Sequence, residues 1–405
     1  MSDTASGPPR KQPPARRGAA PPGNLTGADP DRRDPQSTGA AGAGPTLADL
    51  GEFGLIDRVA RRTAQGPAVL LGPGDDAAIV RVRGGRVVAS TDLLVEGRHF
   101  RRDWSTAYQV GRKAAAQNLA DIAAMGAEPT ALLVGLSAPG DLPVAWAAEL
   151  SRGLAEESAA VGASVAGGDT TRGETLLIAV TALGDLPAGP AVTRAGAQPG
   201  DVVAVAGELG WSACGLDLLL RGEAGLADGA AEPASDSAST DLASTDLASA
   251  DPVSDDLMTL PDNDALARAA AKALARHRVP APPYAAGPAA ARAGASAMLD
   301  VSDGLLADLG HIAAESGVAI DVDPAALAPP PGLAALAGKL GADPLAWILT
   351  GGEDHALVAC FPAEAALPAG WLPIGAVGER APHQPPVTVA GRPWPGRPGW
   401  DHFSS

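Results

Sequence analysis

The chain has 405 residues and a formal net charge of −17, and 46% of its residues are hydrophobic although only 3% are aromatic. This length is enough for two domains with their own cores. The composition predicts that Ala, Val, Leu and Ile build those cores. The acidic charge argues against a nucleic-acid-binding protein, because such proteins normally need a basic surface.

Neither membrane insertion nor secretion is indicated. No apolar run approaches the roughly 18 residues that a membrane span requires, and the N-terminus lacks the hydrophobic region of a signal peptide. We therefore expect a cytoplasmic protein. The two cysteines, Cys214 and Cys360, form neither a disulfide framework nor a CxxC metal motif. We expect each of them to be a small buried apolar residue.

The first 45 residues contain almost no large apolar side chain, which predicts a disordered tail. Residues 46–190 are predicted to form an N-terminal α/β domain. Helices are expected over residues 56–62, 106–125 and 142–161, and strands over residues 77–82, 85–92, 130–136, 164–166 and 175–183. Thr106 or its neighbour Ser105 is the expected N-cap of the second helix, and Gly126 its stop. This order favours a mixed sheet with helices on one face.

Residues 191–405 are predicted to form a second, C-terminal α/β domain that follows a connector at 191–199. Its strands are expected over residues 201–206, 297–301, 318–322, 356–361 and 374–377, and its helices over residues 212–220, 264–276 and 304–316. Residues from about 222 to 262 contain a repeated Asp-Leu-Ala-Ser and are typical of a low-complexity acidic insertion without a fold of its own.

Six acidic motifs are spread along both predicted domains. They are Gly74–Asp75–Asp76, Ser90–Thr91–Asp92, Asn118–Leu119–Ala120–Asp121, Gly167–Gly168–Asp169, Asp300–Val301–Ser302–Asp303 and Gly351–Gly352–Glu353–Asp354. Crowded carboxylates raise one another's pKa, so a chain that gathers them usually has a cation to hold them. Oxygen ligands suit Mg²⁺, whose coordination is often completed by substrate phosphates. We interpret the motifs as one polynuclear magnesium and phosphate site.

Other phosphate and metal chemistries are disfavoured by the motifs that are missing. The sequence contains no P-loop and no protein-kinase motif set. It also lacks H-E-x-x-H and clustered cysteines, which makes a zinc centre improbable.

Each acidic motif alone also has a simpler interpretation. The Gly-Asp-Asp triplet that ends at Asp76 is commonly a surface turn, and Asp169 after two glycines is open to the same interpretation. Asp300 and Asp303 would serve equally as a helix N-cap and its first-turn acid. Asp121 lies on a mostly Ala helix and would ordinarily face solvent. The occurrence of all the motifs together favours the shared site.

The basic residues have similar pairs of interpretations. Lys113 is typical of a lone surface charge. Arg194 lies in the connector, where it would either reach a nucleotide phosphate or remain solvated. His99 would contact a substrate phosphate or cap a loop. His311 and His355 favour structural roles, because no nucleophile pairs with either.

Together these motifs resemble the thiamine-monophosphate kinase family, part of the ATP-binding superfamily that includes aminoimidazole ribonucleotide synthetase. The resemblance covers residues 47–220 and 264–405, and includes Asn118–Pro129, Thr193–Gly200 and Gly399–Phe403. It implies transfer of the γ-phosphoryl group of ATP to thiamine monophosphate, giving thiamine diphosphate. The tail and the acidic insertion have no counterpart in this resemblance.

The resemblance also implies roles for individual residues. Those expected to hold several Mg²⁺ ions are Asp76, Ser90, Thr91, Asp92, Asp121, Asp169, Asp300 and Asp303. Those expected to contact ATP are Gly168, Asp169, Arg194 and Ser302. Those expected to contact thiamine monophosphate are His99, Glu353 and Trp400, and the indole of Trp400 suits stacking on a thiazolium cation.

The fold implied by the resemblance is a two-domain α/β (α+β) fold of the aminoimidazole ribonucleotide synthetase type. The N-terminal sheet would pair with its twin across a homodimer to form a barrel, with ATP between the domains. Near Arg152 and Gly153, where the family carries an aromatic residue by the nucleotide, this chain has none, so no adenine contact is assigned.

Related activities and other classes remain as alternatives. Selenophosphate synthetase needs a reactive residue near the N-terminus, but no Cys precedes Cys214, and the hydrogenase-maturation carbamoyl dehydratase needs a C-terminal Cys that this chain lacks. A non-catalytic nucleotide-binding regulator and a purely structural interaction protein are the alternatives from other classes.

Overall fold

A computed structural model of the chain describes residues 44–50, 54–55, 65–72, 77–186, 189–228 and 262–400. The predicted tail, the predicted helix at 56–62, Asp76 and most of the predicted acidic insertion lie outside these ranges. The end of the chain after Trp400 also lies outside them.

The first large element is a four-stranded mixed sheet with the strand order β3-β6-β4-β5. Its strands are β3 (Val87–Val95), β4 (Glu128–Ala138), β5 (Ser164–Arg172) and β6 (Leu177–Asp185). β4 and β5 run parallel, whereas β6 is antiparallel to both β3 and β4. The short pair β1 (Val69–Leu71) and β2 (Ile79–Val80) lies nearby, and Val69 packs against Ala131 and Ala166 of the sheet.

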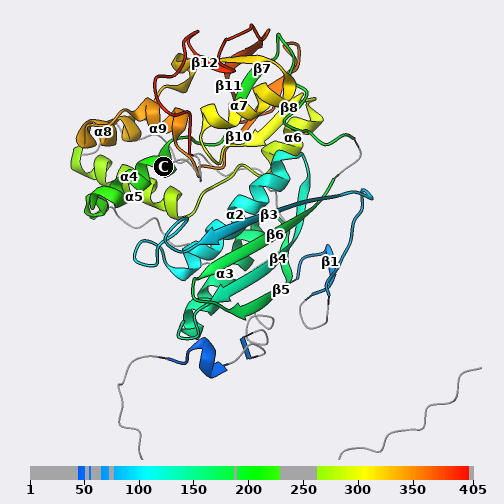
Figure 1. Cartoon of the computed structure of the whole chain (residues 1–405), viewed down its shortest axis with the longest axis vertical. Coiled ribbons are helices and arrows are strands. Elements are labelled where there is room, and N and C mark those ends of the chain that lie inside the picture. The colour runs from blue at the N-terminus through cyan, green and yellow to red at the C-terminus, as the bar shows by residue number, and fades with distance from the viewer. Residues whose placement is uncertain are drawn as a thin grey trace, which may run out of the picture. The chain divides into compact units, whose positions relative to one another are not determined.

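Two helices, α2 (Ala107–Ala124) and α3 (Val144–Ala160), lie against one face of this sheet (Figure 1). The start of α2 follows from its capping box, in which Thr106 and Gln109 each accept a hydrogen bond from the other's backbone N–H. Gly126 adopts a φ of 73° after the last turn, a conformation that favours glycine. The predicted helix boundaries and the helices on one face are confirmed.

The second sheet has six strands in the order β12-β9-β11-β7-β10-β8 and is antiparallel except for the parallel pair β12 and β9. Its strands are β7 (Val202–Ala206), β8 (Ala297–Asp300), β9 (Ala319–Val322), β10 (Leu357–Phe361), β11 (Trp371–Gly378) and β12 (Val387–Val389). Its helices are α4 (Trp211–Arg221), α5 (Asp262–Arg278), α6 (Ala286–Arg292), α7 (Leu305–Ser316), α8 (Pro331–Leu340) and α9 (Pro344–Thr350), with 3-10 turns η1 (Ala224–Ala227) and η3 (Pro324–Leu327).

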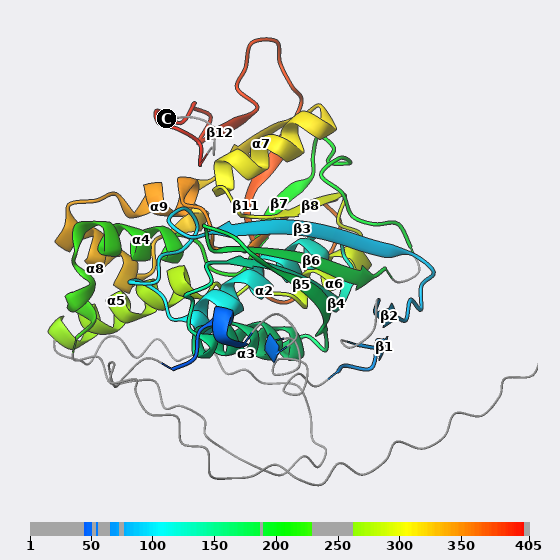
Figure 2. The same ribbon diagram turned by 60° about the horizontal axis from the view of Figure 1, so that its bottom comes forward.

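Helices α4, α5, α8 and α9 form a group beside one another, which both views show (Figure 1, Figure 2). The apolar side chains of α4, α5 and α7 share one core with alternate residues of the six-stranded sheet, including Val203 and Val358. Residues of the opposite register, such as Ala204 and Ala359, pack instead with α6 and with the last turn of α2.

Helix α2 therefore contacts both sheets. Leu119 and Ile122 belong to the core under the four-stranded sheet, whereas Ala123 and Ala124 belong to the core that includes β7, β8 and β10. Asp121 lies between Leu119 and Ile122 in the sequence and directly precedes the segment that packs into the second core. Asp121 thus belongs to the part of α2 that packs into both cores.

Several predicted boundaries are wrong. β5 runs to Arg172 instead of ending at residue 166, because its pairing with β4 continues through Ala138. Residues 222–228, the predicted start of the insertion, include the turn η1, which packs beside α5. The sequence analysis did not predict β1, β12, α6, α8 or α9.

The two sheets fall on either side of the predicted domain boundary at residues 190 and 191. Residues from Gly44 onward group as one compact unit, so the division into two domains stays a prediction.

Cys214 and Cys360 are free and buried, as expected. Among the described residues, every helix is too short or too polar to cross a bilayer.

Candidate functional site

Two hydrogen bonds join β3 to α2. The Ser90 hydroxyl donates to Asp121 Oδ2 at 2.6 Å, and the backbone N–H of Asp92 donates to Asn118 Oδ1 at 3.1 Å. Asn118 and Asp121 are one helical turn apart, so both face the strand. The simpler interpretation, in which Asp121 faces solvent, is therefore wrong.

The Asp121 carboxyl is crowded by other carboxylates. Burial raises its pKa to about 7, and the charges of Asp300 and Asp92 act in the same direction, while the hydrogen bond from Ser90 opposes the shift. A divalent cation would relieve this repulsion, and carboxylate and hydroxyl oxygens are the donors that Mg²⁺ prefers.

The donor types fit magnesium, but their positions do not complete a ligand set. In the described part of the chain, no three Asp, Glu, His or Cys side chains are arranged to hold a metal ion. Asp76, one of the expected ligands, lies outside the described residues.

Asp300 ends β8 and is 6% exposed. Its Oδ2 lies 2.9 Å from His355 Nδ1. Although burial opposes protonation of His355, this hydrogen bond and the negative charge of Asp300 raise the pKa of the imidazole. His355 therefore holds a predicted metal ligand in place, which agrees with the structural role expected for it.

The loop between β8 and α7 is fixed by Asp308, a residue that the sequence analysis did not select. Its Oδ2 accepts hydrogen bonds from the backbone N–H groups of Ser302, Asp303 and Gly304 at 3.0 to 3.1 Å. Burial raises the pKa of Asp308 to about 7, and the charge of Asp300 adds to the shift. The N-cap of α7 is Gly304, so the alternative in which Asp300 and Asp303 cap this helix is wrong.

Trp400 reaches the same loop from the end of the chain. Its backbone N–H donates to the carbonyl of Asp303 at 2.8 Å, and its side chain is 64% exposed. The indole predicted to contact thiamine monophosphate thus lies next to a predicted metal ligand and remains accessible.

Lys113 is buried, which contradicts the expectation of a lone surface charge. Its Nζ donates to Glu353 Oε2 at 3.0 Å and to the carbonyl of His277 at 3.2 Å. The helix of small residues around it gave no sign of this contact, because Glu353 lies 240 residues further along the chain.

Three predicted residues lie apart from this cluster. Thr91 faces away from α2, since its hydroxyl lies 3.0 Å from that of Thr181 on the opposite face of the sheet. Gly168 and Asp169 lie on β5, which is separated from β3 by the two strands β6 and β4. A Cβ on Gly168 would lie 1.9 Å from the carbonyl oxygen of Val134, so close strand pairing already requires glycine there. The interpretation of Asp169 as part of a turn is wrong.

Arg194 and His99 are also separate from the cluster. The carbonyl of Arg194 accepts a hydrogen bond from Ser316, the last residue of α7. Arg194 therefore lies at the C-terminal end of this helix, whereas Ser302 lies before its N-terminal end. His99 Nδ1 accepts a hydrogen bond from the backbone N–H of Val95 at 3.0 Å, which confirms its role in closing a loop. The predicted ligand contacts of both residues remain predictions.

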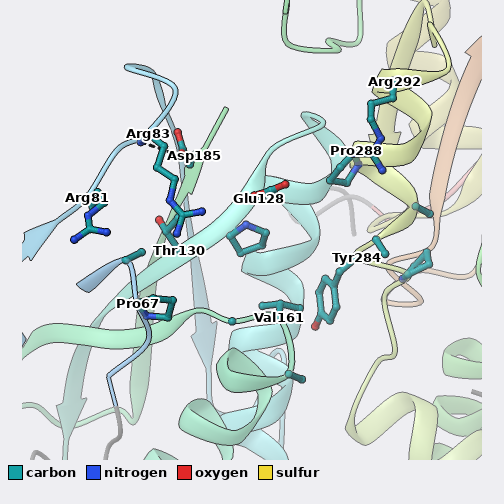
Figure 3. Close-up of a pocket in the computed structure, with 17 residues that line it drawn as sticks. Pro67, Arg81, Arg83, Glu128, Thr130, Val161, Asp185, Tyr284, Pro288 and Arg292 are labelled. Carbon is teal, nitrogen blue, oxygen red and sulfur yellow. Dashed lines mark hydrogen bonds between the residues drawn. The ribbon is translucent and has the colours of Figure 1, made fainter. Parts of the chain in front are cut away.

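A cavity of about 650 Å³ lies beside β2 and α6 and does not coincide with these residues (Figure 3). Arg81, Arg83, Glu128 and Tyr284 are among its lining residues, and none of the predicted site residues lines it. This cavity therefore lies apart from the predicted site residues.

Comparisons with known proteins identify the relatives of this chain. The family described as AIR synthase related protein, N-terminal domain, matches residues 74–186. The thiamine-monophosphate kinase of Mycobacterium tuberculosis (strain CDC 1551 / Oshkosh) is 47% identical over 360 residues, which is 89% of this chain and 93% of that protein.

Solved structures agree. The crystal structure of thiamine-monophosphate kinase from Stenotrophomonas maltophilia K279a matches with a TM-score of 0.66 and 34% identity, covering 85% of this chain and 98% of that one. A structure described as AaThiL complexed with AMPPCP and TMP matches with a TM-score of 0.64 and 30% identity, covering 88% and 98%. The chain belongs to the thiamine-monophosphate kinase family.

Proposed function

We propose that this chain transfers the γ-phosphoryl group of ATP to thiamine monophosphate and so produces thiamine diphosphate. The observation that carries the proposal is the 47% identity to a thiamine-monophosphate kinase along 89% of this chain. The related AaThiL structure contains AMPPCP, an ATP analogue, together with TMP, which supports the same pair of substrates here.

The chemistry asks for charge neutralisation and alignment more than for a strong base. The acceptor is already an anionic phosphate, so the protein must bring two anions together and hold them in line. Magnesium, when bound, supplies the neutralising charge. In this chain the described residues best placed to hold it are Ser90 and Asp92 in the middle of β3, Asp121 in the last turn of α2, Asp300 at the end of β8 and Asp303 in the loop that follows.

The remaining predicted ligands stay part of the proposal on the resemblance alone. Thr91 faces the side of the four-stranded sheet away from α2, and Asp169 lies on the edge strand β5. Asp76 is outside the described residues. Gly168, Arg194 and Ser302 are proposed to contact ATP. Among them, only Ser302 lies beside the acidic cluster, where Asp308 fixes its backbone.

Thiamine monophosphate is proposed to bind on the side of Glu353 and Trp400, with His99 as a further contact. Trp400 is tied to Asp303 through its backbone, so an acceptor stacked on its indole would lie near the predicted metal ligands. This arrangement would place the acceptor phosphate next to the γ-phosphate.

A homodimer is proposed from the exposed face of the four-stranded sheet. Leu93 and Leu133 are 53% and 37% exposed and point away from α2. Such apolar residues on a sheet face are suited to burial against a second copy, which is consistent with the barrel implied by the resemblance. Sedimentation of the wild type and of Leu93→Glu would test this, since a dimer held through this face should dissociate in the variant.

The cytoplasmic location and the two-domain division also remain proposals. The use of ATP is consistent with a cytoplasmic location, and the two separate sheets are consistent with two domains.

The activity is tested by incubating the full chain with Mg²⁺, ATP and thiamine monophosphate and separating thiamine diphosphate by chromatography. We expect product with the complete mixture and none after EDTA is added. Asp92→Asn should reduce the product strongly, whereas the exposed Asp141→Asn should not. ATP consumption without thiamine diphosphate, in any Mg²⁺ concentration, would refute the proposed reaction.

A further inference from the structure

Lys113 is one of the most buried charged residues in the described part of the chain, since its side chain is 3% exposed. An ammonium group loses most of its hydration at such a position, which costs free energy unless partners replace the water. Here the carboxylate of Glu353 and the carbonyl of His277 are those partners. The partners come from α5 and from the loop after α9, whereas Lys113 belongs to α2.

The loop that carries Glu353 has an unusual backbone. Glu353 has a φ of 63° and His355 a φ of 52°, although neither residue is glycine. A left-handed conformation is unfavourable for a non-glycine residue and persists where the surroundings determine it.

Three consecutive side chains of this loop are each bound by a different element. Glu353 pairs with Lys113 of α2. Asp354 accepts hydrogen bonds from the backbone N–H groups of Gly210 and Ser212 at the start of α4, at 2.6 and 2.9 Å. His355 pairs with Asp300 at the end of β8. The loop is therefore held at three points, one of which is a predicted metal ligand.

The two oxygens of Glu353 are not equivalent. Oε2 faces Lys113 at 3.0 Å and His277 Nδ1 at 3.6 Å. Oε1 makes no hydrogen bond with any residue that the structure describes, and the side chain is 33% exposed. Burial opposes ionisation of Glu353, but the charge of Lys113 and the hydrogen bond from it hold its pKa below the ordinary value. One oxygen of an ionised carboxylate is thus left to accept a hydrogen bond.

We propose that Lys113 is a positioning residue for the acceptor substrate: it fixes the carboxylate of Glu353 so that Oε1 accepts a hydrogen bond from an amino group of that substrate. The aminopyrimidine ring of thiamine monophosphate carries such a donor. Because Lys113 and Asp121 are both on α2, the same contact couples the acceptor-binding loop to the helix of the predicted metal site. This inference rests on the proposed function.

Lys113→Met tests the inference, because Met has a similar length and no charge. In the full chain with Mg²⁺ and ATP, we expect the KM for thiamine monophosphate to rise about tenfold or more, while the KM for ATP changes by less than about twofold. Lys272→Met is the matched control, since Lys272 pairs with Glu208 at 2.5 Å outside the predicted site and is 39% exposed. The control should leave both KM values unchanged.

A double variant separates positioning from a general structural role. If Lys113 acts through Glu353, adding Lys113→Met to Glu353→Gln should raise the KM for thiamine monophosphate no further than Glu353→Gln alone. A purely structural role would instead lower kcat or change both KM values together. An unchanged KM for thiamine monophosphate in folded Lys113→Met overturns the inference.

Folding is checked by circular dichroism and thermal unfolding. If Lys113→Met does not fold, Lys113→Arg replaces it, because a planar guanidinium cannot reproduce the position of an ammonium at a buried site. An unchanged KM for thiamine monophosphate in both Lys113→Arg and Glu353→Gln then overturns the inference. A wild type that makes no thiamine diphosphate refutes the proposed function instead, so the two failures are distinguishable.

Discussion

The hydroxyl of Ser90 donates a 2.6 Å hydrogen bond to Asp121 Oδ2, and this contact joins β3 to the helix that lies between the two sheets. Asp300 ends β8 on the other side, and its charge acts on the same carboxyl. Residues separated by some 180 positions of sequence thus meet because α2 packs on both sheets.

We expect Asp121→Asn to lower the turnover of thiamine monophosphate by about 100-fold or more without loss of folding, because a charge that stabilises the reacting phosphates through bound magnesium is removed. Burial and two neighbouring carboxylates raise the pKa of Asp121 to about 7, so a neutral amide is less costly at this position. The thermal midpoint without magnesium should stay equal or rise. Turnover at the wild-type level, or a fall in the midpoint with an unaffected Asp141→Asn control, would contradict this account.

Asp308→Ala should impair catalysis through the loop that it holds. Three backbone N–H groups would lose their acceptor, which costs about 1–3 kcal/mol of stability and frees Ser302 and Asp303 to move. We expect kcat/KM for ATP to fall by roughly tenfold or more. Glu315→Ala, an exposed acid on the same helix, is the control in both assays. If Asp308→Ala matches this control in steady-state kinetics, the loop is held by other contacts.

Much of the fold was predictable because its signals are local. Thr106 and Gly126 set the ends of α2 through capping and through a glycine conformation, and both are visible within a few residues of sequence. The strands β7 and β10 are short apolar runs, and all of their residues except the first of β7 are buried. The length of β5 was not predictable, because Gly167 and Gly168 resemble a turn until β4 is paired with them.

The candidate site was predictable in its chemistry but only partly in its geometry. The residue types indicated a cluster of carboxylates that binds phosphates. The alternation of side chains along β3 decides that Ser90 and Asp92 face α2, whereas Thr91 faces the other side of the sheet. Lys113 and Asp308 escaped selection for a related reason. A lysine on an Ala-rich helix and an acid in the first turn of a helix are ordinary in sequence. The partner of Lys113 lies 240 residues away, and the partners of Asp308 are backbone N–H groups that no side-chain motif marks.

Close helix packing predicts the effect of a small substitution. A Cβ on Gly111 would lie 2.0 Å from the carbonyl oxygen of Leu150, and one on Gly153 would lie 2.1 Å from that of Tyr108. Helices α2 and α3 therefore touch backbone to backbone. We expect Gly111→Ala to lower the free energy of unfolding by about 2 kcal/mol or more, measured by urea denaturation.

Gly310→Ala is the matched control for that measurement, because Gly310 is also helical and a Cβ there meets no atom within 4 Å. It should be neutral or slightly stabilising, since alanine favours the helix over glycine. Equal effects of the two substitutions would show that α2 and α3 can separate without cost.

The pH dependence of stability should reveal the buried imidazole of His277. Burial, together with the charges of Lys113 and Arg278, lowers its pKa to about 4 against the opposing charge of Glu353. Between pH 6.5 and 4 the unfolded chain binds a proton that the folded chain does not, so stability falls as the pH falls through this range. Urea unfolding at pH 7 and pH 5 should therefore show that His277→Gln loses less free energy than the wild type, by roughly 2 kcal/mol. An identical loss in both proteins would mean that His277 is already protonated in the folded chain.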